Sequence, residues 1–372
     1  MGAAVLVFET DKLLPALREA CEAVERRNAI NVLHNVLIEA DGEGVTLTTS
    51  DLDIMVRRAV PLESSNGAAR FTVNALRLLA VVGAFQSGSQ TAIEFDAGAA
   101  VVKSGRARTR FAVIPADDFP VIANSEATAS FAVRGLALNQ AFGAVRHAIS
   151  TEETRYYLNG IFLHVRDGTL RFAATDGYRL AQLVTPLPDG AAEVPDCIIP
   201  TKTVDIMRKA AEVRGDAPIE IAVSAGKIVF DVEGFTLTSK LIDGTFPQYE
   251  QTIPSDIKVQ AIVDRDAAVQ ASGRVLVATS DKVRAALLRF APETLSFTVR
   301  SADHGDAVDE AGCDFDAKQP FEIGFNLRFL RDALQALDVD TVRFGMTDAA
   351  GPTLLTSNPP GALSLVLMPM RA

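Results

Sequence analysis

The segment IGFNLRFLRDALQAL (323–337) joins a short apolar strand to an amphipathic helix, and this change of pattern occurs three times. It appears again in FTVNALRLLAVVGAF (71–85) and in IIPTKTVDIMRKAAEV (198–213). The copies begin about 125 residues apart, which is far longer than one unit of a solenoid. A repeat of this length predicts three copies of one domain within the 372 residues.

Other elements recur in the same order around this segment. Each copy opens with an amphipathic helix and continues with a strand, starting at Glu9 and Val45, at Val133 and Leu170, and at Val263 and Leu295. Each copy closes with strands of alternating polarity whose turns contain Gly, Asp, Asn and Pro. The polar runs ANSEATAS and PSDIK predict domains 1–126, 127–254 and 255–372. We expect an α+β fold with two helices on antiparallel sheets in each domain, although coincidental similarity of three α+β segments remains an alternative.

The composition is that of a folded protein, with 48% hydrophobic and 22% charged residues. The sequence has no window of about 18 apolar residues and no basic leader, so we expect no membrane contact and a cytoplasmic location. Cys21, Cys197 and Cys313 lack the spacing of a disulfide framework or a zinc site, and we expect them to be buried as small hydrophobic residues.

Positive charge is concentrated in particular helices of a chain whose net charge is −11. The segments 71–86, 131–150, 199–214 and 325–337 carry +1, +2, +2 and +1, which leaves −17 on the remainder. Basic helix faces that line one surface would attract phosphate without reading bases. The alternative is that Lys and Arg are simply good helix formers on solvated faces.

The sequence offers little for catalysis. It contains neither HExxH nor a G-x-S-x-G elbow, and no cofactor is expected. Asp51 with Asp53, or Asp117 with Asp118, could bind Mg²⁺, although acids at strand ends and turns are more common. Two alternative hypotheses follow, namely a Mg²⁺-dependent enzyme that processes nucleic acid and a cytosolic scaffold without a DNA role.

Several stretches carry a family resemblance: RYYLNGIFLHV, ATDGYRLA, LIDGTFPQYEQTIP, GFNLRFLRDAL and MPMRA. Together with the three units they resemble the bacterial sliding clamp, the beta subunit of DNA polymerase III, over essentially the whole chain. The resemblance implies a non-catalytic processivity factor whose two protomers join head to tail into a ring around duplex DNA of any sequence. It also implies partners that carry short clamp-binding motifs, including the replicative polymerase and the clamp loader.

The resemblance assigns roles to individual residues. It implies a peptide pocket, completed by the C-terminal LSLVLMPMRA, that involves Leu158, Thr175, Gly177, Tyr178, Arg179, Leu180, Pro247, Asn326, Phe329, Val366, Met368, Pro369, Met370 and Arg371. It implies DNA contacts at Arg27, Tyr156, Tyr157 and Lys202, and a dimer seam at Phe111, Val113 and Val277. Gln251, Val283 and Tyr178 depart from the family pattern, which puts one pocket edge in doubt. Plain core filling is the alternative role for Met368 and Met370.

Overall fold

The computed structural model describes residues 4–41, 44–96, 98–123, 125–280, 284–301 and 305–371. Contacts divide the chain into two compact units. Unit 1 contains Met1–Ala137, Glu193–Pro195 and Asp205–Leu241, and unit 2 contains Leu138–Ala192, Asp196–Val204 and Ile242–Ala372.

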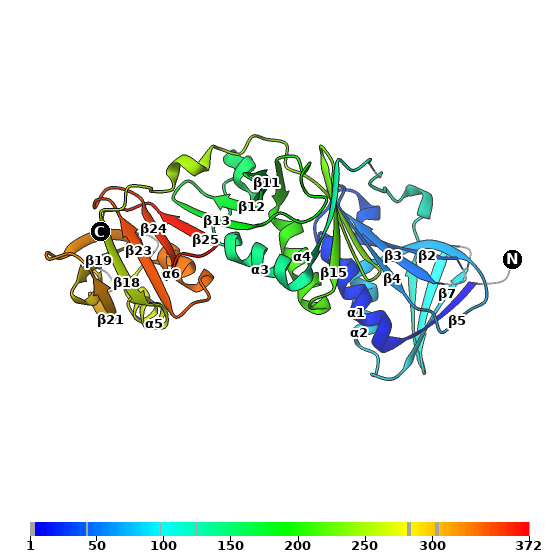
Figure 1. Cartoon of the computed structure of the whole chain (residues 1–372). Coiled ribbons are helices and arrows are strands. Elements are labelled where there is room, and N and C mark those ends of the chain that lie inside the picture. The colour runs from blue at the N-terminus through cyan, green and yellow to red at the C-terminus, as the bar shows by residue number, and fades with distance from the viewer. Residues whose placement is uncertain are drawn as a thin grey trace. The chain divides into compact units, whose positions relative to one another are not determined.

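One order of elements occurs three times in the described residues (Figure 1). A strand leads into a helix, three strands follow, a further strand enters a second helix, and three strands close the repeat. The first repeat contains β1 (Ala4–Glu9), α1 (Thr10–Ala20), β2 (Asn35–Ala40), β3 (Val45–Ser50), β4 (Ile54–Val60), β6 (Ala69–Asn74), α2 (Ala75–Gly83), β7 (Gln90–Asp96), β8 (Ala99–Ser104) and β9 (Ala107–Ala112), with the short β5 (Ser64–Ser65) added.

The other two repeats follow the same plan. The second contains β10 (Ala129–Arg134), α3 (Gly135–Arg146), β11 (Gly160–Arg166), β12 (Thr169–Thr175), β13 (Arg179–Pro186), β14 (Cys197–Pro200), α4 (Thr201–Arg214), β15 (Pro218–Val223), β16 (Lys227–Val232) and β17 (Phe235–Lys240). The third contains β18 (Val259–Asp264), α5 (Arg265–Val275), β19 (Ala285–Ala291), β20 (Glu293–Val299), β21 (Ala307–Phe315), β22 (Phe321–Asn326), α6 (Leu327–Ala336), β23 (Thr341–Met346), β24 (Thr353–Ser357) and β25 (Leu363–Leu367). The predicted α+β class is confirmed.

The second and third repeats start differently from the prediction. We expected the opening helices to begin near Val133 and Val263, but these residues lie in strands β10 and β18, and the helices begin at Gly135 and Arg265. The strands extend further because they add main-chain hydrogen bonds to β15 and β23. A six-residue strand directly before a helix has too little sequence for its alternating pattern to be recognised reliably.

Side-chain caps explain how a strand can change directly into a helix. Asn74 Oδ1 accepts a hydrogen bond from the Arg77 backbone N at 3.0 Å, and Asn326 Oδ1 accepts one from the Arg328 N at 3.1 Å. These asparagines satisfy amide groups that the first helical turn leaves without a partner. Helices α2 and α6 therefore start at equivalent positions in their repeats.

Sheets continue from one repeat into the next. In unit 1, β17 pairs with β4 within a sheet of order β10-β15-β16-β17-β4-β3-β2-β6. In unit 2, β25 pairs with β13 within a sheet of order β14-β11-β12-β13-β25-β24-β23-β18-β21-β20-β19-β22. The last strand of one repeat thus pairs with the fourth strand of the preceding repeat, so each compact unit combines a terminal repeat with part of the central one.

The helices contribute apolar faces to the cores of the sheets. In the first repeat, Leu13 and Leu17 of α1 and Leu78 of α2 are fully buried in one cluster with Phe71. The three cysteines are buried and unpaired, and burial raises the pKa of the Cys21 thiol to about 12. None of the helices in the described part of the chain has the length and apolar character needed to cross a membrane.

Candidate binding pocket

Unit 2 contains a pocket of about 300 Å³ that four segments form. These segments are the 3₁₀ helix η4 (Glu153–Leu158), the turn between β12 and β13, the 3₁₀ helix η5 (Tyr249–Thr252) with the residues before it, and the end of β25. The lining residues are Arg155, Tyr157, Leu158, Thr175, Gly177, Arg179, Leu180, Pro247, Gln248, Tyr249, Thr252, Val366 and Met368.

The floor of the pocket is apolar. Leu158, Leu180 and Val366 are at most 4% exposed and belong to one hydrophobic cluster that also contains Tyr249 and Phe246. Because β13 and β25 are adjacent strands, Leu180 and Val366 are direct partners in the sheet register. Pairing between the second and third repeats therefore creates this floor, which suits apolar side chains.

The turn in ATDGYRLA is fixed by its own side chains. Asp176 Oδ1 accepts hydrogen bonds from the backbone N of Tyr178 at 2.9 Å and of Arg179 at 3.0 Å. Gly177 has φ +89°, a conformation that side chains disfavour, and a Cβ there would lie 2.7 Å from Arg155 Nη1. The Asp-Gly pair thus lets Arg155 lie against the turn at the pocket wall.

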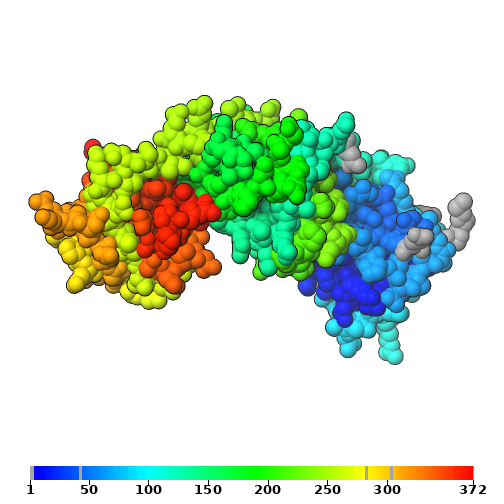
Figure 2. All heavy atoms as spheres, viewed as in Figure 1, coloured from blue at the N-terminus to red at the C-terminus, as the bar shows by residue number. Residues whose placement is uncertain are grey.

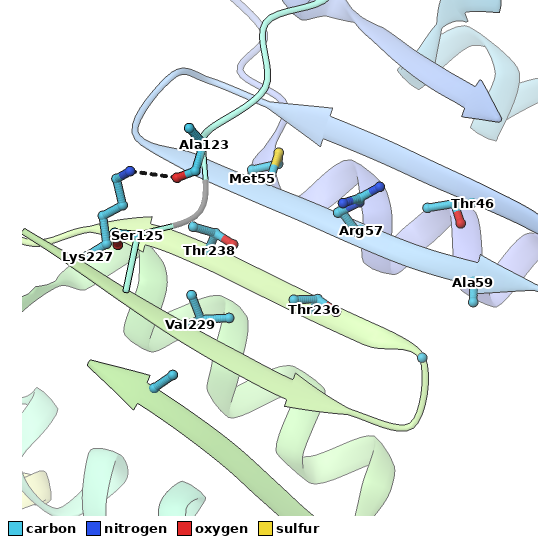
Figure 3. Close-up of a pocket in the computed structure, with 12 residues that line it drawn as sticks. Thr46, Met55, Arg57, Ala59, Ala123, Ser125, Lys227, Val229, Thr236 and Thr238 are labelled. Atoms are coloured by element: carbon cyan, nitrogen blue, oxygen red, sulfur yellow. Dashed lines mark hydrogen bonds between the residues drawn. The ribbon is translucent and has the colours of Figure 1, made fainter. Parts of the chain in front are cut away.

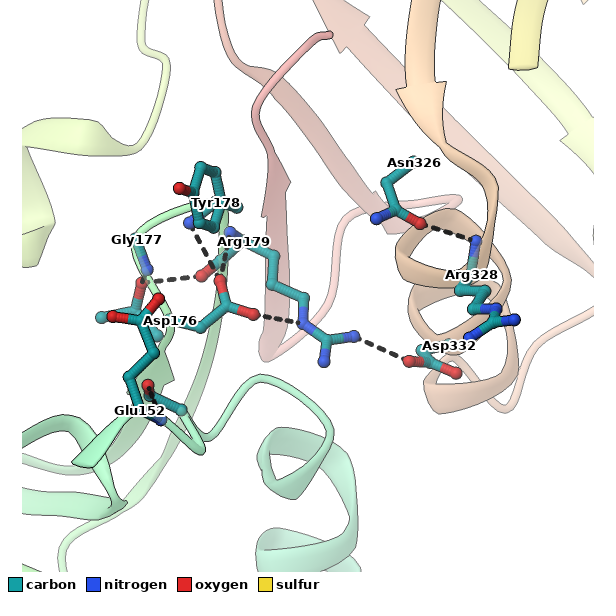
Figure 4. A network of polar contacts seen from close by, with 10 residues as sticks. Glu152, Asp176, Gly177, Tyr178, Arg179, Asn326, Arg328 and Asp332 are labelled. Carbon is teal, nitrogen blue, oxygen red and sulfur yellow. Dashed lines mark hydrogen bonds and ion pairs between the residues drawn. The ribbon is translucent and has the colours of Figure 1, made fainter. Parts of the chain in front are cut away.

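Arg179 connects the pocket wall to helix α6 (Figure 4). Its Nε lies 3.0 Å from Asp176 Oδ2 and its Nη1 lies 2.7 Å from Asp332 Oδ2, while the guanidinium carbon is 4.1 Å from the centre of the Phe329 ring. The side chain is only 12% exposed, so these two carboxylates compensate a largely buried charge.

The C-terminal segment is anchored through its main chain. The Met368 N donates to the Tyr178 carbonyl at 2.9 Å, and the Met370 N donates to the Gly324 carbonyl at 2.8 Å. Met368 and Met370 remain 42% and 39% exposed, which does not fit plain core filling. In the space-filling view this segment, in red, lies at the surface of unit 2 (Figure 2).

Not all residues that the resemblance assigned to the pocket line it. Leu158, Thr175, Gly177, Arg179, Leu180, Pro247, Val366 and Met368 do. Tyr178 is 59% exposed beside them, Asn326 caps α6, Phe329 lies under Arg179, and Pro369, Met370 and Arg371 lie outside the lining set. Gln251 donates to the Gln248 side chain at 3.1 Å, and Val283 lies outside the described residues.

Five lining residues were absent from the predicted pocket: Arg155, Tyr157, Gln248, Tyr249 and Thr252. Tyr157 had instead been assigned to DNA. All five lie in RYYLNG or FPQYEQT, the stretches that carried the resemblance. The sequence signal was therefore present, but the inward direction of each side chain depends on the two 3₁₀ helices.

The equivalent junction in unit 1 has a different surface (Figure 3). A groove of about 480 Å³ lies over β4 and β17, where Thr236, Thr238 and Arg57 line it. Lys227 Nζ donates to the Ala123 carbonyl across its edge at 2.7 Å. By sheet register, Met55 and Thr238 stand where the unit 2 pocket has Leu180 and Val366, so a hydroxyl replaces one of the two apolar floor residues.

The residues assigned to DNA have separate environments. Arg27 is exposed in unit 1, whereas Tyr156 is 54% exposed and Lys202 half-buried in unit 2. One residue of the predicted basic helix faces does not face solvent. This residue is Arg214, in segment 199–214. Its side chain is 3% exposed and contacts both Glu19 carboxylate oxygens, at 2.8 and 3.0 Å.

The residues assigned to the dimer seam also differ in exposure. Phe111 in β9 is 6% exposed and Val113 packs against the same core. Val277 lies in the 3₁₀ helix η6 (Leu276–Ala278) and is 84% exposed, the largest value among the large hydrophobic residues described.

The aspartates of the Mg²⁺ hypothesis have structural contacts. Asp51 Oδ1 accepts from the backbone N of Asp53 at 2.9 Å and of Ile54 at 2.6 Å, and Asp53 Oδ1 lies 3.0 Å from Lys240 Nζ. Across the described ranges, no three His, Cys, Asp or Glu residues are grouped so that they could hold a metal ion.

Three family models of the DNA polymerase III beta subunit match the chain in order. The N-terminal domain matches residues 5–123, the central domain residues 132–248, and the C-terminal domain residues 250–371. The beta sliding clamp of Caulobacter vibrioides is 36% identical over 98% of this chain and 99% of its own length. That of Pseudomonas putida is 30% identical over the same shares.

Solved structures agree with these matches. A Bartonella birtlesii sliding clamp bound to griselimycin has a TM-score of 0.96 at 34% identity, and a Caulobacter crescentus clamp has 0.95 at 36%, each over 100% of both chains. The threefold repeat is thus that of a DNA clamp. The chain belongs to the beta sliding clamp family, the beta subunit of DNA polymerase III. It is a DNA sliding clamp and a non-catalytic processivity factor in replication, which replaces the enzyme and scaffold hypotheses.

Proposed function

We propose that two copies of this chain join head to tail into a ring around duplex DNA, and that partner proteins dock in the unit 2 pocket. The proposal rests on the way in which strands of successive repeats pair with one another. The closing strands β17 and β25 each pair with the fourth strand of the preceding repeat, β4 and β13. The same rule applied to β9 requires the fourth strand of a third repeat, β21, from a second copy.

Both strands have an available edge. Within the described residues, β9 is the end strand of the sheet β5-β1-β7-β8-β9. β21 pairs with β20 from Ala307 to Cys313 and reaches β18 only at Cys313–Phe315, which leaves the other side of its first half without a strand among the described residues. Unpaired edges of this kind are templates for pairing with another chain. A head-to-tail contact that closes after two copies gives a ring.

The two edges carry opposite charges. Arg106, Arg108 and Arg110 lie in or beside β9, and Asp306, Asp309 and Glu310 lie in or beside β21. The β9 side contains a cavity of about 440 Å³, and its lining includes Arg77, Arg110 and Phe111. Val277 and Val308, 84% and 64% exposed, are apolar residues available on the other side. This complementarity favours a contact between unlike edges over one between like edges.

A charge exchange tests the head-to-tail arrangement. Arg108→Glu with Arg110→Glu gives variant X, and Asp306→Lys with Glu310→Lys gives variant Y. Each variant alone faces like charge at both seams, and we expect its dimer to weaken about a hundredfold or more. An equimolar mixture restores opposite charges at both seams, so sedimentation equilibrium should again give a dimer.

The outcomes separate the possible arrangements. A head-to-head contact joins β9 to β9 and β21 to β21, so wild type, X and Y alone would all face like charges there, and X or Y alone would dimerise no more weakly than the wild type. Dimers of X alone at micromolar concentration would contradict the proposal. The double change Lys227→Glu with Lys258→Glu, which alters the same number of charges away from β9 and β21, serves as the control and should leave the dimer intact.

The pocket supports binding of a short linear motif from the polymerase, the clamp loader and other partners. Burial of two or three apolar side chains of the partner would contribute roughly 1.5–3 kcal/mol of binding free energy each. After the cost of ordering the peptide is subtracted, this corresponds to about micromolar affinity. We expect griselimycin, which the Bartonella birtlesii relative binds, to compete with such peptides. The domains 1–126, 127–254 and 255–372, a cytoplasmic location and DNA contact through Arg27, Tyr156, Tyr157 and Lys202 belong to the same proposal.

A further inference from the structure

A buried polar cluster lies beneath the pocket. Tyr249, which lines the pocket, places its hydroxyl 2.9 Å from His164 Nε2 in β11 and accepts a hydrogen bond from Gln182 Nε2 in β13 at 2.9 Å. Tyr249, His164 and Gln182 are 2%, 0% and 7% exposed. The hydroxyl of a pocket residue is therefore held by two groups that do not line the pocket.

One hydrogen bond of the cluster has a fixed direction, because the Gln182 amide donates to the Tyr249 hydroxyl. That hydroxyl also bonds to His164 Nε2, as donor to one histidine tautomer or as acceptor from the other. In either tautomer His164 Nδ1 is buried and has no hydrogen-bond partner among the described residues. Such an orphaned buried group is costly and is retained only where its other contacts compensate.

The remaining contacts of this pocket wall are less directional. Phe246 stacks on Phe162 at 4.7 Å with an interplanar angle of 7°, and Phe162 stacks on His164 at 4.5 Å. Stacked rings can slide with little loss of energy, whereas a hydrogen bond weakens steeply when its angle changes. The Tyr249 hydroxyl is thus the directional attachment of segment 246–252 to the sheet.

We infer that His164 and Gln182 are positioning residues for the peptide pocket, because they hold Tyr249, and with it the wall formed by 246–252, in the shape that accepts a partner peptide. The inference rests on the proposed peptide-binding role of the pocket.

Protonation of His164 provides a second way to test the contact with the Tyr249 hydroxyl. Burial lowers the pKa of His164, with Arg166 and Arg171 acting in the same direction and the carboxylates of Asp196 and Glu250 opposing them. In the protonated ring both nitrogens are donors, so Nε2 can only donate to the Tyr249 hydroxyl, and a charge lies under the wall. A bound peptide that excludes water disfavours this charged form further, so peptide affinity falls as pH falls through the lowered pKa that His164 has in the peptide-free protein.

A double-mutant cycle tests the inference in the full-length dimer. His164→Phe keeps the ring but removes the nitrogen, Tyr249→Phe removes the hydroxyl, and the double variant combines them. The probe is a capped peptide with two leucines and a phenylalanine and no titratable group, titrated between pH 7.5 and 5.5. Each single variant should weaken binding about threefold to tenfold at pH 7.5. The double variant should be no weaker than Tyr249→Phe, and the two variants that lack His164 should lose the pH dependence of the wild type.

Controls make each outcome decisive. His34→Phe removes a histidine whose Nε2 lies 3.2 Å from the Asn28 carbonyl in unit 1, and it should leave affinity and pH profile unchanged. Gln182→Met provides a second variant if His164→Phe does not fold. Additive losses, or an unchanged pH profile in His164→Phe, would overturn the inference. Wild-type protein that fails to bind the peptide at any pH would instead overturn the proposed pocket.

Discussion

At the scale of single residues, two turns at equivalent positions have the same geometry but different residues. Asp51 and Asp176 each accept two backbone hydrogen bonds, and the next residue has positive φ in both turns, 80° at Leu52 and 89° at Gly177. Leucine tolerates this conformation at a cost of about 1 kcal/mol. At Gly177 a side chain would also meet Arg155.

We expect Gly177→Ala to weaken peptide binding at least tenfold and to destabilise the protein by about 1 kcal/mol, because the backbone is strained and Arg155 is displaced from the pocket wall. Peptide titration and thermal unfolding measure the two effects. Leu52→Gly, at the equivalent turn, should relieve strain and leave peptide affinity unaltered. Unchanged affinity in Gly177→Ala would exclude this turn from the binding site.

The burial of His147 leads us to predict that the stability of the protein depends on pH. Burial lowers the pKa of His147 to about 4, and the Arg179 guanidinium acts in the same direction. The unfolded chain therefore takes up a proton near pH 6.5 that the folded chain does not, and stability present above pH 6.5 is lost as pH falls toward 4. The loss is at most about 1.4 kcal/mol per pH unit for this group. The thermal midpoint of His147→Gln should fall less steeply over this range, and equal slopes would contradict the assignment.

At the scale of elements, the structure ties the C-terminal segment to two other parts of unit 2. β25 pairs with β13, and the residues after it donate hydrogen bonds to Tyr178 and Gly324. β25 is part of the sheet, whereas the segment after Leu367 lies outside the strand and contributes Met368 to the pocket lining. Sheet and pocket can therefore be separated by truncation.

Deletion of residues 368–372 should abolish peptide binding and leave the dimer intact, because Val366 and β25 remain while Met368 is lost from the pocket lining. Fluorescence anisotropy of a labelled peptide and sedimentation equilibrium measure the two properties. Deletion of 371–372 alone, which spares Met368, is the matched control. A truncated protein that binds peptide with wild-type affinity would remove the segment from the site.

At the scale of the whole molecule, the repeated strand pairing leaves, among the described residues, one open edge on β9 and one along the first half of β21. In the proposed ring a second copy pairs with these edges, which links ring closure to function. A closed ring holds DNA by topology, so retention does not require strong phosphate contacts and is insensitive to salt.

The charge-exchanged variants allow this to be tested without a loader. We expect X and Y, mixed in the presence of nicked circular duplex, to close around it and to remain bound at about 0.5 M salt during gel filtration, where phosphate contacts are weak. Cutting the circle once should release the protein, because a ring slides off a free end. Equal retention on circular and linear DNA would contradict encirclement.

Sequence patterns alone were sufficient for the threefold order of helices and strands, because alternating and helical periods are local properties of the chain. The family resemblance, and not these patterns, implied that the tail and the Asp-Gly turn belong to one site. The patterns did not indicate the strands β10 and β18, the burial of Arg214 against Glu19, or the pairing of β17 with β4. Each of these depends on contacts between residues far apart in the chain, which a local period does not encode.

The amino-acid sequence by itself determined three repeats, their α+β class and the family to which the chain belongs. Only the tertiary structure decided which side chains line the pocket, why Tyr249 stands there with His164 and Gln182 beneath it, and which strand edges remain open. The physical reason is that burial, hydrogen-bond partners and sheet edges are set when distant segments meet, whereas periodicity and motifs are already present in the unfolded chain.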